Sequence, residues 1–391
     1  MRICANKSGE IRLRERIARA EETGAEVKNN AAPKIGDISE EKEEKRTTIS
    51  RKGLDSGAGK RYNRRKRELG SGGCADRPDT GEESMRIQSF TVISAYDNLA
   101  LACVAYEPES SPKGVFQIVH GMCERKERYD KFMRFLAEHG FVAVAHDHRG
   151  HGASVVSDAD LGWFRDRKAV AIVEDAVQVT RVAKERYPGL PVVLFGHSMG
   201  SMIVRCYLQK HDAEIDKLVV CGSPSKNSLA GAGLALAKSI ALTRGERYRS
   251  PMLAQLSTGN GDKKFPGEGR ACWLTRDRSV TEAYNADPKC NFIFTCNGYE
   301  NLFRLMQSTY NAGKYEVRNP SLPILFVSGS DDAVLISEEK WFASQQFLRD
   351  VGYRNVSGKL YHQMRHEILN EIGKEEVYAD LLAFAEKDVT K

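Results

Sequence analysis

From Met85 onward, short apolar runs alternate with longer segments in which apolar residues recur at helical spacing. The short runs are bounded by turn-forming residues, and several of the longer segments end at Gly or Pro. Runs that predict strands cover residues 86–94, 99–106, 115–119, 141–145, 191–195, 218–221, 322–328 and 357–361. Helices are predicted over residues 128–139, 168–187, 201–210, 337–351 and 371–385. This alternation predicts an α/β fold, with a mostly parallel sheet and helices on both of its faces.

One long interval interrupts the alternation. About 100 residues separate the predicted strand at 218–221 from the one at 322–328, which is too long for a structureless loop in a compact domain. We therefore predict an inserted helical cap over residues 224–318. Within it, residues 229–242 are largely apolar and are broken by Lys238. They suit a lid helix that touches lipid, but their low charge favours a helix that roofs an apolar pocket.

Residues 1–84 have no such pattern. Tyr62 is their one aromatic residue, and only residues 11–28 are compatible with a charged helix. We expect residues 1–84 to be a charged, disordered extension and residues 85–391 to form the folded α/β domain. Because the pattern changes abruptly at Met85, we also expect Met85 to be the physiological start. The basic run at 60–67 is typical of nucleic-acid or localisation patches, although such runs are more often solvated tails.

Charge and cysteine content narrow the class of protein. The net charge is +6, but residues 1–84 hold 20 Lys and Arg against 16 Asp and Glu, which leaves 39 against 37 in residues 85–391. The folded part is thus nearly neutral, and we expect no nucleic-acid partner. Nine scattered cysteines without a C-x-x-C pair favour a reducing compartment. With no apolar signal core or membrane span in the sequence, a cytoplasmic protein is expected, and transient contact of the cap with a membrane surface stays open.

The most informative motif is Gly196-His197-Ser198-Met199-Gly200. It follows an apolar strand and precedes a helix, which is the setting of the nucleophile elbow in α/β-hydrolases. Such a turn holds the serine in a strained backbone conformation and exposes its hydroxyl at the C-terminal end of the sheet. The two glycines are needed because the helix leaves close to the strand, where a Cβ would clash.

A serine nucleophile needs a base and a group that orients the base, and in this fold they follow the serine in the order acid, then histidine. Asp331 and Asp332 follow the predicted strand at 322–328. They point in different directions, so local chemistry leaves the acid open between them. His362 and His366 both follow the last predicted strand. His366 has the better reach, since it lies deeper in the loop.

The negative charge of an acyl-transfer intermediate requires two backbone N–H donors. One is expected from Met199, directly after the nucleophile. The other is expected from the loop after the strand at 115–119, which begins His120-Gly121-Met122 and makes the N–H of Met122 the candidate.

Five motifs in order resemble those of the monoacylglycerol lipase and lysophospholipase-like α/β-hydrolases, the serine aminopeptidase S33 or hydrolase-4 group. They are His120-Gly121-Met122 with Glu124, Arg128 and Tyr129; Asp147-His148-Arg149-Gly150-His151-Gly152-Ala153-Ser154; the Gly196–Gly200 motif; Gly329-Ser330-Asp331-Asp332; and His366-Glu367. The resemblance covers about residues 85–388. It implies Ser198 as nucleophile, Asp332 as acid, His366 as base, and hydrolysis of carboxylic esters such as monoacylglycerols or lysophospholipids.

The predicted mechanism needs no metal and no cofactor, and its partner is a small acyl ester or lipid. We interpret Glu124 and Arg128, four residues apart, as a structural ion pair. Two alternatives remain open. A peptidase or thioesterase of the same fold would use the same residues, although nothing in the sequence marks a site for a peptide amino terminus. A non-catalytic module would bind polyanions through the basic run at 60–67.

Overall fold

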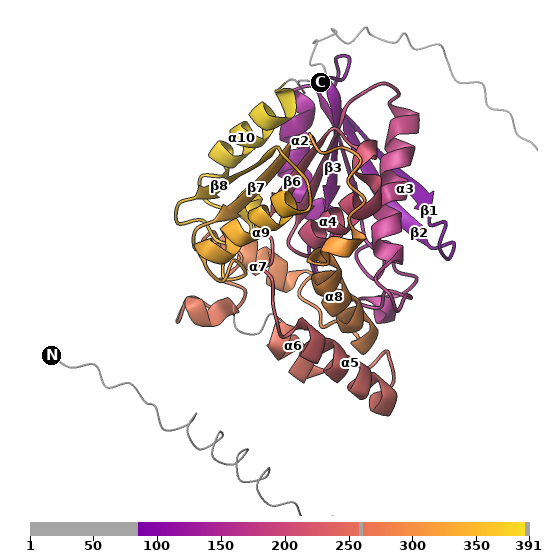
Figure 1. Ribbon diagram of the computed structural model, residues 1–391, viewed down its shortest axis with the longest axis vertical. Coiled ribbons are helices and arrows are strands. Elements are labelled where there is room, and N and C mark those ends of the chain that lie inside the picture. Colours follow the sequence, from indigo (N-terminus) through magenta and orange to yellow (C-terminus); the bar gives the residue numbers. More distant parts are fainter. Residues whose placement is uncertain (1–84, 258–260, 388–391) are drawn as a thin grey trace, which may run out of the picture. The chain divides into compact units, whose positions relative to one another are not determined.

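The computed structural model describes residues 85–257 and 261–387, so the predictions for residues 1–84 lie outside its described part. Within that part, eight strands form one sheet in the order β1-β2-β4-β3-β5-β6-β7-β8 (Figure 1). Their bounds are β1 (Arg86–Ile93), β2 (Ala100–Glu107), β3 (Gly114–Val119), β4 (Phe141–His146), β5 (Val192–His197), β6 (Lys217–Cys221), β7 (Ile324–Gly329) and β8 (Val356–Tyr361). The β1–β2 and β2–β4 pairs are antiparallel and the others are parallel. All eight predicted strands are confirmed.

Helices cover both faces of the sheet, which confirms the predicted fold class (Figure 1). One face packs against α2 (Asp130–Glu138) and α10 (Lys374–Glu386). The other packs against α3 (Ala171–Arg186), α4 (Met199–His211) and α9 (Glu338–Asp350). Strand β5 shows why: Val192 and Leu194 belong to the second core, whereas Val193 and Phe195 belong to the first. Alternate side chains of a strand point to opposite faces, so a strand buried on both sides must be apolar throughout.

Three predicted helices begin two or three residues later than their apolar pattern indicates, and in two of them a buried carboxylate stands at the true start. Helix α3 begins at Ala171 rather than 168, because the Asp166 carboxylate accepts the N–H groups of Val170 and Ala171 at 2.8 and 3.0 Å. Helix α10 begins at Lys374 rather than 371. Glu371 accepts the backbone N–H of Arg276 at 2.9 Å, and Gly373 has a left-handed φ of 84°. The predicted helix at 128–139 opens with a separate 3-10 turn, η1 (Lys126–Tyr129).

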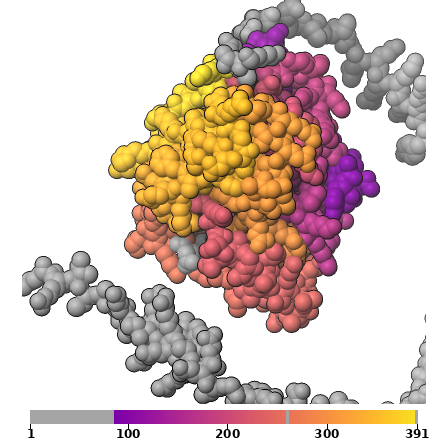
Figure 2. All heavy atoms as spheres, viewed as in Figure 1, coloured from indigo at the N-terminus to yellow at the C-terminus, as the bar shows by residue number. Residues whose placement is uncertain are grey.

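The interval between β6 and β7 is helical. It contains α5 (Ala230–Arg244), α6 (Pro251–Ser257), α7 (Arg278–Ala286) and α8 (Cys296–Thr309). In the space-filling view the atoms of this segment gather at one end of the described domain (Figure 2). The seven cysteines of residues 85–387 that the structure describes are free and buried. No helix in those residues is long and apolar enough to cross a membrane.

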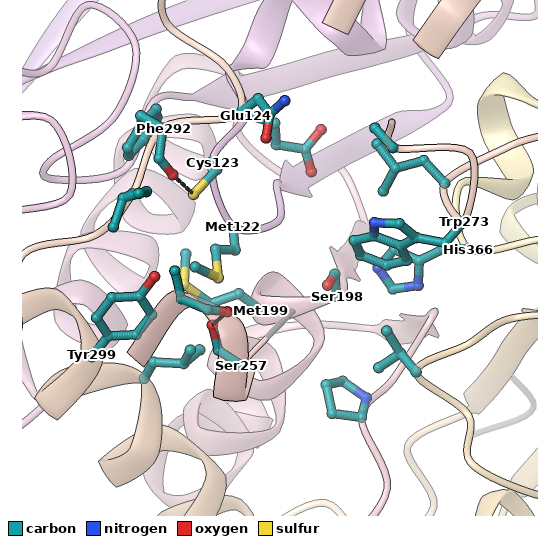
Figure 3. Close-up of a pocket in the computed structure, with 18 of the residues that line it drawn as sticks. Met122, Cys123, Glu124, Ser198, Met199, Ser257, Trp273, Phe292, Tyr299 and His366 are labelled. Carbon is teal, nitrogen blue, oxygen red and sulfur yellow. Dashed lines mark hydrogen bonds between the residues drawn. The ribbon is translucent and has the colours of Figure 1, made fainter. Parts of the chain in front are cut away.

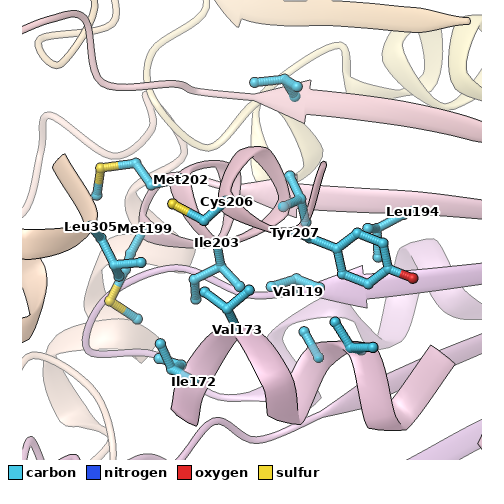
Figure 4. Close-up of a cluster of buried hydrophobic side chains, with 14 of the residues drawn as sticks. Val119, Ile172, Val173, Leu194, Met199, Met202, Ile203, Cys206, Tyr207 and Leu305 are labelled. Atoms are coloured by element: carbon cyan, nitrogen blue, oxygen red, sulfur yellow. The ribbon is translucent and has the colours of Figure 1, made fainter. Parts of the chain in front are cut away.

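Helix α4 is held firmly in the core, which matters because it begins next to Ser198. Its apolar side chains meet those of α3, β3, β5 and α8 (Figure 4). Ile203 and Tyr207 are fully buried there, and Met199 and Met202 are nearly so. Close packing of this kind leaves the turn between β5 and α4 little freedom to relax.

Candidate functional site

The turn between β5 and α4 has the strained geometry expected of a nucleophile elbow. Ser198 has φ 53° and ψ −114°, a region that non-glycine residues rarely occupy. Its N–H donates to the carbonyl of Cys221 at 3.0 Å, which ties the turn to β6. A Cβ at Gly196 would lie 2.5 Å from the carbonyl oxygen of Gly200, and one at Gly200 would overlap the carbonyl oxygen of Val119. Both glycines are therefore required by close backbone approach, as predicted.

The histidine loop after β8 brings His366 to the same cavity as Ser198 (Figure 3). The imidazole of His366 is 1% exposed, and its Nδ1 donates to Asp332 Oδ2 at 2.9 Å and Oδ1 at 3.0 Å. That hydrogen bond leaves Nε2 as the nitrogen available to a hydroxyl. The competing histidine, His362, is exposed directly after β8.

The two adjacent aspartates occupy different environments. Asp332 is 2% exposed, and besides His366 it accepts the Val334 N–H at 2.8 Å and the Ser328 hydroxyl at 3.0 Å. Burial acts to raise the pKa of Asp332, but His366 and these donors outweigh it and hold the pKa below its ordinary value. Asp332 is thus held as a carboxylate. Asp331 is only half-buried, and its carbonyl accepts the Lys264 ammonium at 3.0 Å.

Met122 and Met199, whose N–H groups are the candidate oxyanion donors, both line this cavity (Figure 3). Met199 begins α4, and Met122 lies in the loop after β3. That loop lies against Ser198, since a Cβ at Gly121 would be 3.2 Å from Ser198 Cβ. Within the described residues, neither the Met122 nor the Met199 N–H donates a hydrogen bond, so both are available to a ligand.

A buried ion-pair network forms part of the cavity wall. The predicted pair of Glu124 and Arg128 is confirmed, with Arg128 Nη1 2.9 Å from Glu124 Oε2. Arg128 also forms a two-pronged bond to Glu367, at 2.5 and 2.6 Å. His197 Nδ1 lies 3.2 Å from Glu124 Oε1, and its Nε2 lies 3.2 Å from the carbonyl oxygen of His366.

This network shifts the charges of its members. Burial favours neutral forms of both Glu124 and His197, but their mutual attraction outweighs it. The pKa of Glu124 is therefore lowered and that of His197 raised, so the two form an ion pair. Sequence reasoning missed the links to His197 and Glu367. All four residues stand in the shared motifs, but a contact across 73 positions leaves no local signal.

The cavity has a volume of about 470 Å³. Its apolar wall comes largely from α6 and α8, with Leu256, Tyr299, Leu302, Phe303 and Met306 among the lining residues. The prediction that residues 229–242 roof the pocket is wrong: α5 packs against α8 and contributes no lining residue among those described. Trp273, which the sequence did not single out, packs against His366 with ring centres 4.8 Å apart and ring planes tilted by 35°. In residues 85–257 and 261–387, no group of three or more His, Cys, Asp or Glu side chains has an arrangement that could hold a metal ion.

Comparison with known proteins agrees with the fold. The chain is 26% identical over 280 residues to a monoacylglycerol lipase of Mycolicibacterium smegmatis, covering 71% of this chain and 90% of that protein. It is 27% identical over 298 residues to the monoglyceride lipase of Homo sapiens, covering 74% and 89%. A solved thermostable carboxyl esterase of Bacillus coagulans, in complex with glycerol, superposes with a TM-score of 0.71 at 26% identity, covering 78% of this chain and all of that one.

The profile of one family spans most of the described domain. It matches residues 110–373, which include the elbow, both candidate oxyanion donors, the loop with Asp331 and Asp332, and the histidine loop. With this match, and with the elbow geometry and eight-stranded sheet described above, the chain belongs to the serine aminopeptidase S33 (hydrolase-4) family of α/β-hydrolases.

Proposed function

We propose that this protein hydrolyses carboxylic esters of the monoacylglycerol or lysophospholipid type, with Ser198 as nucleophile, His366 as base and Asp332 as the orienting acid. The observation that carries the proposal is the buried Asp332–His366 hydrogen bond, which is 2.9 Å long. His366 and Ser198 line the same cavity. The names of the relatives, monoacylglycerol and monoglyceride lipases, support the substrate class.

In this mechanism His366 Nε2 takes the proton of the Ser198 hydroxyl as the oxygen attacks the acyl carbonyl. The N–H groups of Met122 and Met199 stabilise the resulting oxyanion. Asp332 keeps the proton of His366 on Nδ1 and stabilises the imidazolium. His366 then protonates the leaving alcohol, and water releases the acid from the acyl-enzyme by the same steps. Every role falls on a side chain or backbone amide of this chain.

The shape of the cavity supports a substrate with an acyl chain. Apolar side chains of α6 and α8 offer a surface for hydrocarbon, while Glu124, Tyr284 and Glu367 supply polar groups near His366. An apolar pocket with a few placed polar groups is the usual form of a small-molecule site. We further propose that the cap touches membrane surfaces transiently, since Leu229 and Leu242 at the ends of α5 are 70% and 88% exposed.

Replacing Ser198 tests the nucleophile. Ser198→Ala removes the attacking oxygen, so kcat/KM for a p-nitrophenyl ester should fall by about three orders of magnitude or more. A fluorophosphonate probe should label the native protein and not the variant. Retention of full activity by Ser198→Ala, or labelling that survives in it, would refute the assignment.

The type of bond that is cleaved is tested by a panel on the purified protein. Monoacylglycerol, lysophospholipid, an acyl thioester and an aminoacyl amide should be compared by kcat/KM, with Ser198→Ala as the blank. We expect the two lipid esters to be preferred. A preference for the amide or the thioester would instead identify a peptidase or thioesterase of the same fold.

A further inference from the structure

Four histidines are buried together behind the loop that carries Met122. We call residues 120–123 the oxyanion loop. The histidines are His120 within it, His146 at the end of β4, and His148 and His151 on the segment that follows β4, and each is at most 1% exposed. Ring centres lie 3.9 Å apart for His120 and His148, 4.8 Å for His146 and His148, and 5.2 Å for His120 and His151. The mechanism above uses none of them.

Carbonyl partners assign the tautomer of each ring that touches the loop, because a carbonyl oxygen can only accept. His120 Nδ1 donates to the Gly121 carbonyl at 2.8 Å, so its Nε2 accepts the His148 N–H at 3.0 Å. His148 Nε2 donates to the His120 carbonyl at 2.9 Å. His151 Nδ1 donates to the Arg149 carbonyl at 3.1 Å, so its Nε2 accepts the Cys123 N–H at 3.3 Å.

Within the described residues, the Met122 N–H donates no hydrogen bond, whereas the N–H groups of the residues on either side of it both do. On one side of Met122, the Gly121 N–H donates to Glu124 Oε1 at 2.5 Å. On the other, the Cys123 N–H donates to His151. Cys123 has a φ of 56°, a left-handed conformation that a side chain disfavours and that surrounding contacts must maintain. This conformation directs the Cys123 amide to His151 and leaves the Met122 amide for a ligand.

We propose that His151 is a positioning residue for the oxyanion loop: its neutral imidazole holds the Cys123 amide and thereby aims the Met122 N–H at the oxyanion. The inference rests on the proposed function, since the Met122 amide has this role only if Ser198 attacks an acyl carbonyl. His151 acts through the backbone and touches no reacting atom.

The surroundings of His151 keep its ring neutral. The titratable groups facing it are His120, His148, Cys123 and Glu124, and its remaining ring neighbours are Phe164, Phe292 and Phe294. Burial lowers the pKa of His151 to about 4, although the Arg149 carbonyl and Glu124 act in the other direction. A protonated ring would donate at both nitrogens and could not accept the Cys123 N–H.

The test compares variants that keep or remove the acceptor. His151→Phe retains a ring among the three phenylalanines but loses the acceptor. Its kcat for a p-nitrophenyl ester should fall about 10- to 100-fold with KM nearly unchanged, because a displaced donor weakens the transition state more than the ground state. His151→Gln supplies an amide oxygen and should recover most of that loss. A trifluoromethyl ketone, whose adduct with a serine carries an oxyanion, should bind His151→Phe more weakly by a similar factor.

Phe164→Leu is the matched control, because Phe164 packs on the His151 ring at 5.7 Å and does not line the cavity. It should lower Tm and leave kcat unchanged, which separates stability from positioning. If His151→Phe does not fold, His151→Leu replaces it.

Two results would overturn the inference. One is a folded His151→Phe or His151→Leu whose kcat stays within about twofold of native, well short of the loss expected for a misplaced donor. The other is a His151→Gln that recovers none of the lost kcat. Either result, together with an inactive Ser198→Ala, would leave the proposed function intact. Activity retained by Ser198→Ala would overturn both the proposed function and the inference about His151.

Discussion

The adjacent residues Asp331 and Asp332 have the same side chain but differ in burial and in hydrogen-bond partners. Asp332 is enclosed and bonded to His366, Val334 and Ser328, whereas Asp331 is half-buried at the rim of the loop. A carboxylate can fix the tautomer of a histidine only when it is held against Nδ1. Under the proposed function, the two aspartates should therefore contribute very differently to turnover.

Asp332→Asn and Asp331→Asn form a matched pair for testing this assignment. The first replaces an acceptor with an amide that can favour the wrong imidazole tautomer, so kcat should fall by about 10⁴-fold. The second should leave kcat within about twofold, as is usual for changes away from the reacting groups. Steady-state kinetics at neutral pH measure both. Equal losses in the two variants would show that the acid has been misassigned.

At the scale of elements, the helices of the cap differ in what they contact. α6 and α8 line the cavity, while α5 packs on α8 and exposes apolar side chains to solvent. Lys238, four residues before Leu242, shares its face of α5. Exposed apolar side chains beside basic ones favour contact with anionic lipid surfaces. Helix α5 is therefore the element on which the proposed membrane contact depends.

Leu242→Glu tests that contact. It places a carboxylate where we expect lipid, so the fraction of protein that sediments with phosphatidylcholine–phosphatidylserine vesicles should fall severalfold. Phe342→Glu is the control, because Phe342 is 54% exposed but lies on α9, outside the cap. Equal binding by the native protein and Leu242→Glu, or equal losses in both variants, would count against a role for α5.

At the scale of the whole molecule, one buried network joins the parts that form the site. Glu124 belongs to the segment after β3, His197 to the elbow and Glu367 to the histidine loop, and Arg128 links the two carboxylates. Arg128 also lies over the ring of Tyr284 from the cap, 4.7 Å from its centre. Loss of one charge in such a network leaves its partner buried and unpaired, which is costly.

The pH dependence of stability should report this network. Because the pKa of His197 is raised in the folded state, its contribution is fully present below the unfolded value of about 6.5 and is lost as pH rises through the folded value. The pKa of Glu124 is lowered, so its contribution is lost only in acid. The Tm difference between the native protein and His197→Gln should therefore be largest near pH 6 and shrink in alkali.

A Glu124→Gln background provides the control for this measurement. Without the carboxylate, His197→Gln should no longer produce a Tm difference that declines with rising pH. A difference that stays constant from pH 6 to pH 9 in the native background would contradict the ion pair.

Much of the fold could be predicted because its signals are local. Strands such as β5 are buried on both faces and read as continuous apolar runs, and the elbow requires Gly196 and Gly200 within five residues. The start of α3 could not be predicted. It depends on Asp166, whose side chain competes with the periodic pattern for the first N–H groups of the helix.

The sequence by itself determined the order of strands and helices along the chain and the tight turn at Gly196–Gly200. It also predicts the loops in which a nucleophile, an acid, a base and two amide donors lie. It did so because each of these depends on neighbours a few positions away. Only the tertiary structure decided what depends on distant segments: which helices of the cap line the cavity, the pairing of Glu124 with His197, and the contact of His151 with the Cys123 amide. Those contacts form only when the sheet brings the ends of β3, β4, β5 and β8 together.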